Sequence, residues 1–222
     1  MTAPAPAAAA TVYRPQEDTR LLIDALSRLP VRGRRVLDLC TGSGPVAAAA
    51  LRLGAREVIG VDSSEHAVAA ARARSSSPTW TTLEGTVAEF THPELFDIVT
   101  CNPPYVPAPS DPADCRAVPG PAHAWDAGID GRAVLDTLCR RASDLVAPEG
   151  HLLVVQSQLA QPERTWDLLH HNGFHVVEAG FFRIPFGPVI RARRGWLIRR
   201  GLLGAHEPGE LLTVLLARRS RR

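Results

Sequence analysis

The tetrapeptide Asn102–Tyr105, with the sequence NPPY, follows directly on the β-branched and apolar run at residues 98–100. Its two prolines remove two backbone N–H donors and end any strand, which predicts a stiff loop with a use of its own. We interpret this NPPY turn as a substrate site. The side-chain oxygen of Asn102 and a main-chain carbonyl would accept both hydrogens of one planar –NH₂ group, while Tyr105 offers a ring face for stacking.

Such a turn has a definite chemical use. An amide or exocyclic amine nitrogen is a poor nucleophile because its lone pair is delocalised. Two acceptors on its hydrogens favour the positively charged nitrogen that develops during methyl transfer, and a fixed position in line with the methyl donor supplies the rest. No metal and no strong base is required, so the catalytic candidates are Asn102, Pro103 and Tyr105. The alternative is that the prolines form a rigid turn and nothing more.

A second group of candidates follows the strand expected at 34–40. Asp38 leads into a loop of small residues, 41–44, and a helix begins at once. Small residues let the backbone approach a ligand closely, and a helix N-terminus offers free N–H groups. Asp62, eighteen residues beyond Gly44, ends the next strand, where a carboxylate could accept both hydroxyls of a ribose.

The type of cofactor depends on Asp38. The segment GSGPVA at 42–47 satisfies a loose dinucleotide-binding pattern, which alone is weak support for NAD. Asp38 would repel a pyrophosphate, but it could hold the ammonium of an amino-acid moiety. With two closely spaced glycines and Pro45 at the helix start, the loop favours S-adenosylmethionine, with S-adenosylhomocysteine as product. A tight strand-to-helix turn without a ligand is the alternative.

The elements that must position these residues alternate along the chain. Helices are expected at 17–29, 45–53, 65–74, 130–146 and 162–171, and strands at 34–40, 57–62, 79–85, 96–102, 151–157, 174–180 and 210–218. This alternation predicts an α/β fold with one Rossmann-like domain, a seven-stranded, mostly parallel sheet and helices on both faces. The sixth and seventh strands are joined without a clear covering helix. We therefore expect the last strand to be antiparallel, as in mixed sheets with a reversed edge.

Composition sets the frame for these elements. The chain has 222 residues, of which 45% are hydrophobic, and this suits one domain at 12–222 with a disordered tail at 1–11. No apolar stretch approaches the ~18 residues of a membrane span. The cysteines, Cys40, Cys101, Cys115 and Cys139, are widely spaced without a Cys-x-x-Cys pair, which indicates neither a zinc site nor disulfides and predicts a reduced, cytoplasmic location.

Two segments have open roles. The connection at 182–209 is rich in arginine, and the net charge of +2 is too mild to indicate a nucleic-acid partner by itself. These arginines could bind RNA or an acidic surface of a protein, or they could form a solvated surface. They are Arg191, Arg193, Arg194, Arg199 and Arg200. The proline-rich stretch 106–121 is either a semi-rigid substrate lid with Trp125 at its base or a surface loop.

From Tyr13 to about Val177 the sequence resembles the HemK/PrmC-type class I methyltransferases, which modify the glutamine side-chain amide of translation release factors. Besides the NPPY turn, two segments bring it nearest the short, Mtq-type branch of eukaryotes and archaea, which lacks a separate N-terminal domain. Residues 13–19, YRPQEDT, are similar to the signature Y-x-P-x-E-D-T of that branch. Residues 124–132, AWDAGIDGR, are similar to its W-x-G-G-x-[DN]-G-R segment.

The resemblance implies roles for individual residues. Thr19 would touch the cofactor, Asp38 its methionine ammonium and Asp62 its ribose, while Trp125 and the NPPY turn, including Pro104, would bind the glutamine. Two positions depart from the family: Cys40 stands where glycine is usual, and Thr86 stands where an aspartate usually meets the adenine amine. The cofactor-binding candidates are Thr19, Asp38, Cys40, Thr41, Gly42, Gly44, Asp62, Ser63, Thr86 and Asn102.

The sequence therefore predicts an S-adenosylmethionine-dependent N-methyltransferase acting on a glutamine in a protein such as a release factor. The main alternative is methylation of an exocyclic base nitrogen in DNA or RNA, because the same turn serves the –NH₂ of adenine or guanine. A small-molecule methyltransferase and a non-catalytic cofactor-binding scaffold are further alternatives. A small zinc-binding activator subunit, which related short-branch enzymes use to cover an apolar strand edge, is a candidate partner.

Overall fold

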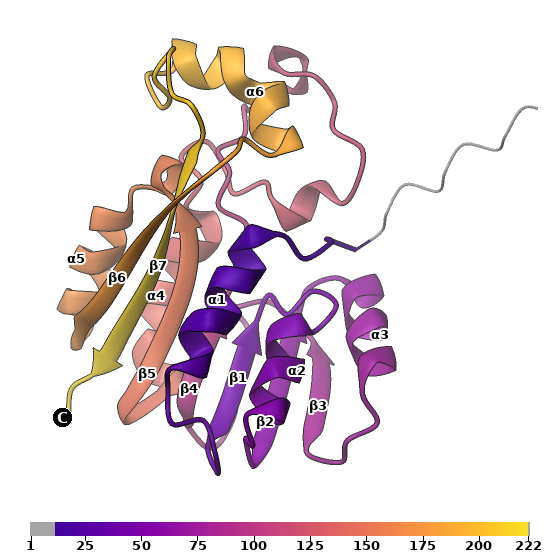
Figure 1. Cartoon of the computed structure of the whole chain (residues 1–222), viewed down its shortest axis with the longest axis vertical. Helices are drawn as coiled ribbons and strands as arrows, with labels where there is room; N and C mark the ends of the chain where they lie inside the picture. Colours follow the sequence, from indigo (N-terminus) through magenta and orange to yellow (C-terminus); the bar gives the residue numbers. More distant parts are fainter. Residues whose placement is uncertain (1–11, 222) are drawn as a thin grey trace, which may run out of the picture.

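The computed structural model describes residues 12–221, and the tail expected at 1–11 lies outside them. Seven strands form one sheet in the order β3-β2-β1-β4-β5-β7-β6, with β7 antiparallel to both of its neighbours (Figure 1). The predicted α/β fold with a mostly parallel, seven-stranded sheet is confirmed. The strands are β1 (Arg35–Leu39), β2 (Glu57–Asp62), β3 (Trp80–Glu84), β4 (Phe96–Cys101), β5 (Val146–Ser157), β6 (Phe174–Ile184) and β7 (Glu210–Arg219).

Helices cover both faces of the sheet, as expected. One apolar core joins one face of the sheet to α1 and α2, and a second core joins the opposite face to α4 and α5. In Figure 1, α3 lies beside α2. The helices are α1 (Glu17–Ser27), α2 (Pro45–Arg52), α3 (Glu65–Arg74), α4 (Ala133–Leu145), α5 (Pro162–His171) and α6 (Pro188–Arg199). Within residues 12–221, no helix combines the length and the apolar character needed to cross a bilayer.

The central strand β1 is buried along its whole length because helices cover it on both sides. The loop that follows it is held close to the sheet by Gly44. The φ angle of Gly44 is +76°, and a Cβ there would lie 2.7 Å from the ring of Trp80 and 3.2 Å from Ala71. Glycine at this position therefore allows α2, α3 and β3 to pack closely beneath the loop.

The position of the last strand corrects one expectation. β7 does not lie at a reversed edge but between β5 and β6, where Leu215 pairs with Val154 on one side and Glu210 pairs with Ile184 on the other. The internal position gives β7 two hydrogen-bonded ladders instead of one. Because β7 is antiparallel, its first residue, Glu210, lies at the edge of the sheet where the parallel strands end.

The connection between β6 and β7 also differs from the expectation. It contains α6, which buries Ile190, Trp196 and Leu197 against the larger core. The arginines between these apolar residues obscured the helical pattern, although Pro188 at the first helical turn is a usual start signal. In Figure 1, α6 and the segment 107–131 lie together beyond the carboxyl ends of the parallel strands.

Candidate active site

A cavity of about 710 Å³ lies at the ends of β1, β2 and β4. Its size is in the range of small-molecule sites. Gly44 is not among the lining residues, and its predicted contact with the cofactor stays a prediction beside the packing role described above. The other predicted site residues all line the cavity: Thr19, Asp38, Cys40, Thr41, Gly42, Asp62, Ser63, Thr86, Asn102, Pro103, Pro104, Tyr105 and Trp125.

Asp38 braces the loop after β1. One carboxylate oxygen accepts hydrogen bonds from the Thr41 hydroxyl (2.6 Å) and the Ala47 N–H (3.2 Å), and the other accepts from the Thr100 hydroxyl (2.7 Å). Burial raises the pKa of Asp38 to about 6, although these hydrogen bonds act in the opposite direction. A buried carboxylate of this kind is stabilised by a nearby positive charge. Asp38 is therefore a suitable partner for an ammonium group.

Asp62 fixes the other side of the loop. Its oxygens accept the Gly42 N–H at 2.8 Å and the Ser64 N–H at 3.0 Å. Each carboxylate oxygen can accept a second hydrogen bond, which suits contact with a diol. Ser64 also caps α3 by accepting the Ala67 N–H, and both Ser63 and Ser64 line the cavity.

The two departures from the family pattern have different structural settings. Cys40 has a φ angle of +54°, in the left-handed region that glycine adopts without strain. Its backbone explains why glycine is usual there. The Thr86 hydroxyl donates to Glu89 (2.8 Å) and accepts the Glu89 N–H (3.2 Å), so it caps a turn. An additional contact of Thr86 with adenine stays a prediction.

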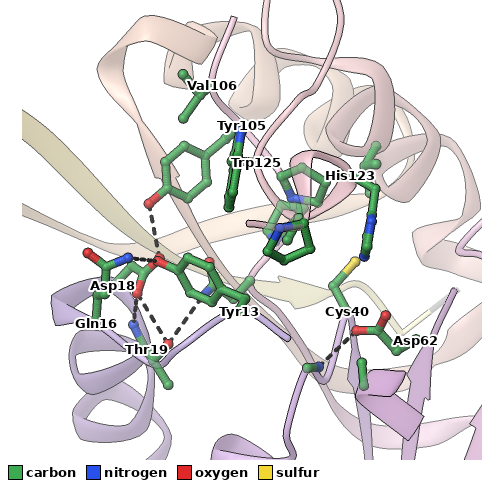
Figure 2. A pocket seen from close by; sticks show the side chains of 18 of the residues that line it. Tyr13, Gln16, Asp18, Thr19, Cys40, Asp62, Tyr105, Val106, His123 and Trp125 are labelled. Carbon is green, nitrogen blue, oxygen red and sulfur yellow. Dashed lines mark hydrogen bonds between the residues drawn. The ribbon is translucent and has the colours of Figure 1, made fainter. Parts of the chain in front are cut away.

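The side chain of Asn102 is oriented by α1. The Thr19 hydroxyl donates to Oδ1 of Asp18 (3.2 Å; Figure 2) and accepts from Nδ2 of Asn102 (3.3 Å). Because Nδ2 is used in this way, Oδ1 of Asn102 is left as the acceptor that the site can offer. Thr19 thus acts on Asn102, in addition to the cofactor contact that the resemblance implies.

Asp18 also holds two tyrosines. Its Oδ2 accepts the hydroxyl of Tyr13 at 2.9 Å and that of Tyr105 at 3.1 Å (Figure 2). Burial raises the pKa of Tyr105 well above its usual value, so the hydroxyl remains a donor. Tyr105 is 9% exposed and presents less ring surface than the open stacking face expected from the sequence. Sequence reasoning missed Asp18 and Tyr13, although both lie in the YRPQEDT segment.

The segment 124–132 packs directly against the NPPY turn. The Val106 N–H donates to the Trp125 carbonyl (3.0 Å), and the Ala127 N–H donates to the Val106 carbonyl (3.2 Å). Gly131 has a φ angle of +74°, and a Cβ there would lie 2.5 Å from the Tyr105 carbonyl oxygen. Residues 118–121 line the cavity as well. These contacts favour the lid interpretation of 106–121 over a detached surface loop.

Arg193 fastens this lid to α6. It donates to the Pro107 carbonyl (3.0 Å) and forms an ion pair with Asp126, and it is 8% exposed. The expectation that Arg193 belongs to a basic surface patch was wrong, because the helix turns it inward. The exposed Arg191 donates to the Phe186 carbonyl at 2.7 Å.

Glu210, the first residue of β7, was also missed by sequence reasoning. It is 5% exposed and lines the cavity. Burial raises its pKa to about 7; a hydrogen bond from Ser157 lowers it, and the nearby charge of Asp18 raises it further. The signal in the sequence was a lone acidic residue at the start of an apolar strand.

Comparison with known proteins agrees with this geometry. The family model described as ribosomal protein L11 methyltransferase (PrmA) matches residues 16–103, from the start of α1 to the first proline of the NPPY turn. The match contains the whole cofactor loop. It ends before the lid, α6 and β7, but it also contains Asp18, Thr19, Asn102 and Pro103.

Two relatives extend the match across the lid. The release factor glutamine methyltransferase of Geobacter sulfurreducens is 30% identical over 173 residues, 74% of this chain and 59% of that protein. Methyltransferase HEMK2 of Homo sapiens is 29% identical over 180 residues, 76% of this chain and 82% of that protein. Over about three quarters of its length the chain is similar to methyltransferases of the HemK/PrmC type. It spans about three fifths of the bacterial relative and most of HEMK2.

The fold is shared with a member of the short branch. The structure of the E. cuniculi Mtq2–Trm112 complex, described as responsible for methylation of the eRF1 translation termination factor, matches with a TM-score of 0.59 and 23% identity. The match covers 94% of this chain and 98% of that one. The fold is also that of a solved S-adenosylmethionine-dependent methyltransferase from Mesorhizobium loti, which matches with a TM-score of 0.59.

Proposed function

We propose that the enzyme transfers a methyl group from S-adenosylmethionine to the side-chain amide nitrogen of a glutamine in a protein, and that the protein is a translation release factor. The observation that carries this proposal is the orientation of Asn102. Its Nδ2 is held by Thr19, and Oδ1 is left as an acceptor in the cavity. An acceptor placed in this way selects a substrate with an –NH₂ group.

The cavity fits the proposed cofactor. Asp38, buried and with a raised pKa, would hold the methionine ammonium, and Asp62 would accept the ribose hydroxyls beside Gly42 and Ser63. Asn102 would contact the cofactor at the point where the methyl group faces the acceptor nitrogen. Bound S-adenosylmethionine supplies a methyl group on a positively charged sulfur, which makes the carbon an electrophile.

The residues of the chain orient the acceptor nitrogen. Oδ1 of Asn102 and the main-chain carbonyl of Pro103 would accept its two hydrogens and stabilise the positive charge that develops on it. Pro103 and Pro104 keep the turn rigid, Tyr105 is fixed through Asp18, and Trp125 closes the side next to the lid. Holding the nitrogen in one place removes most of the entropy cost of the reaction.

The test offers labelled S-adenosylmethionine and purified enzyme to a release factor, a glutamine peptide, total tRNA and rRNA, and DNA in parallel. We expect label in the release factor and the peptide. A matched peptide with asparagine in place of glutamine should remain unlabelled, because its shorter side chain does not reach the turn. Label confined to nucleic acid, or to a small metabolite, would refute the protein substrate.

No contact of the described residues favours a nucleic-acid substrate. Arg193 is buried in its ion pair with Asp126, and Arg191 donates to the protein backbone.

For the partner proposal, the chain is purified alone and together with a small activator of the Trm112 kind. Full activity of the chain alone would exclude a strict requirement for the activator. Methylation of a release factor would also place the enzyme in the cytoplasm.

A further inference from the structure

One buried polar atom in the cavity has no partner. Among the described residues, five buried side-chain nitrogen or oxygen atoms lack a hydrogen bond, and Oε1 of Glu210 is the one whose residue lines the cavity. The others are Trp80 Nε1, Arg132 Nη2, Trp166 Nε1 and Thr213 Oγ1. An unpaired buried acceptor destabilises a protein, and an acceptor that belongs to a carboxylate does so more strongly. Such an atom beside a cavity points to a ligand that supplies the missing donor.

The surroundings of Glu210 show which part of the cavity it serves. Its charge helps to raise the pKa of Tyr13 and Tyr105, and the charge of Asp18 helps to raise the pKa of Glu210, so Glu210 lies near the group that fixes the NPPY turn. Asp18 is itself saturated: it accepts both tyrosine hydroxyls as well as the N–H (2.6 Å) and the hydroxyl of Thr19. The donors of this cluster are therefore already used, and Glu210 lines the cavity with Oε1 unpaired.

We propose that Oε1 of Glu210 accepts an N–H of the acceptor protein, from a residue that flanks the methylated glutamine. This inference rests on the proposed function and extends it, because it adds a second anchor for the substrate beside the NPPY turn. Asn102 selects the –NH₂ group, whereas Glu210 selects the peptide segment that carries it. Glu210 is thus a specificity-determining residue for the reaction.

A role as general base fits the chemistry less well. An amide nitrogen that has gained a methyl group and still carries both hydrogens is a strong acid, and it loses a proton to any nearby acceptor. A carboxylate is not needed for that step. A carboxylate is useful, by contrast, for a charge-assisted hydrogen bond to an N–H in a site from which water is excluded.

The first experiment measures kcat and KM of the full-length enzyme with a glutamine-containing release-factor peptide. For Glu210→Met we expect KM to rise roughly 10- to 100-fold, the usual effect of losing a hydrogen bond to a charged group. Cofactor affinity and kcat should stay within about threefold. Glu210→Gln keeps an acceptor oxygen and should recover most of the loss in KM.

Thr213→Val is the matched control, because Thr213 lies on the same strand with an unpaired buried oxygen but does not line the cavity. It should leave KM unchanged. Thermal unfolding separates recognition from structure: Glu210→Met removes an unpaired buried charge and should not lower the melting temperature of the free enzyme. A clear drop in melting temperature for both Glu210 variants, with KM unchanged, would mean that Glu210 is structural.

A second arm identifies the donor. Backbone N–H groups flanking the glutamine are replaced one at a time by ester oxygens, and flanking side chains with N–H groups are replaced by alanine. We expect that one of these changed peptides lowers kcat/KM of the wild-type enzyme about as much as Glu210→Met does. The same peptide should cause no further decrease when it is tested with the Glu210→Met enzyme. If the wild type methylates the peptide and Glu210→Met has the same KM, the inference is wrong; if the wild type methylates neither the peptide nor a release factor, the proposed function fails first.

Discussion

The two halves of the cavity are built in different ways. In the cofactor half, formed by the residues around Asp38 and Asp62, most of the hydrogen bonds join residues no more than 20 apart in sequence: Asp38 with Thr41 and Ala47, and Asp62 with Gly42. The bond from Thr100 to Asp38, which are 62 residues apart, is the exception. In the acceptor half, the hydrogen bonds join distant segments. Asn102 and Thr19 are 83 residues apart, Tyr105 and Asp18 are 87 apart, and Arg193 and Pro107 are 86 apart.

The halves also differ in what they leave for a ligand. The carboxylates of the cofactor half accept several hydrogen bonds from the protein, whereas the acceptor half keeps Oδ1 of Asn102 and Oε1 of Glu210 without a protein donor among the described residues. The cofactor half is thus a preformed unit, which the L11 methyltransferase family model also matches. We therefore expect substrate choice to depend on the acceptor half, and substitutions there should affect turnover or KM while cofactor affinity stays constant.

The largest effect should come from Asn102→Ala. Removing the acceptor that stabilises the developing positive charge should lower kcat by roughly 1000-fold. Cofactor affinity, measured by calorimetry, should change by no more than a few-fold, because the cofactor loop is held by Asp38 and Asp62. Loss of cofactor binding together with turnover would show that the two halves are not separate units.

Each half contains one buried carboxyl group with a raised pKa, about 6 for Asp38 and about 7 for Glu210. Between about pH 4 and pH 7 the folded chain therefore binds more protons at these groups than the unfolded chain, and their contribution to stability falls as the pH rises. Each group should lower the free energy of unfolding by on the order of 2–3 kcal/mol across its window.

Denaturant unfolding at pH 5 and pH 7.5 checks this prediction. Glu210→Gln should remove the part of the decrease that extends toward pH 7 and leave the part due to Asp38. Saturating cofactor should remove the part due to Asp38 instead, because its ammonium compensates that charge. Equal pH dependence in the wild type and Glu210→Gln would contradict the assignment.

Thr19→Val should separate positioning of Asn102 from cofactor binding. Without the hydroxyl, Nδ2 of Asn102 loses its acceptor and the side chain can rotate, so kcat should fall roughly 10- to 100-fold. Thr19→Ser keeps the hydroxyl and should restore most of the activity. A large loss of cofactor affinity in Thr19→Val, at unchanged kcat, would instead support the direct cofactor contact that the resemblance implies.

Arg193→Met should loosen the lid. It removes the bond to the Pro107 carbonyl and the ion pair with Asp126, so KM for the acceptor should rise by about 10-fold, equivalent to about 1.4 kcal/mol. Cofactor affinity should be unaffected. Arg200→Met, at an exposed position next to the end of α6, is the control and should behave as the wild type. Equal effects of both substitutions would indicate a general role of positive charge.

The smallest effect is expected for Cys40→Gly in the cofactor half. Glycine relieves the left-handed backbone strain at φ +54° but loses more conformational entropy on folding. The net gain should be about 1 kcal/mol, or roughly 2–4 °C in melting temperature. Activity should be unchanged, and a lower melting temperature would mean that the Cys40 side chain contributes more through packing than its backbone costs.

The difference between the halves also decides what could be predicted from the sequence. The cofactor loop depends on local signals, namely a buried strand, small residues and a proline at the helix start, and these predicted the residues around Asp38 and Asp62. The packing of Gly44 against Trp80 was not predicted, because Trp80 is distant in sequence.

The acceptor half was predicted only where a motif marked it. The NPPY turn and Trp125 were found, but their supports were not: Asp18 and Glu210 become neighbours of Tyr105 only in the folded sheet. Arg193 was assigned to the surface because charge alone does not reveal which side of a helix faces inward. The place of β7 could not be derived either, since strand order depends on a long connection without a periodic pattern.

The internal position of β7 has a consequence for synthesis. β6 pairs with no strand other than β7 in the described sheet, so it can join the sheet only after residues 210–219 have been made. A nascent chain on the ribosome can thus complete its cofactor loop first, while the carboxylate of Glu210 is added later. The enzyme would acquire the ability to hold its methyl donor before it can recognise what to methylate.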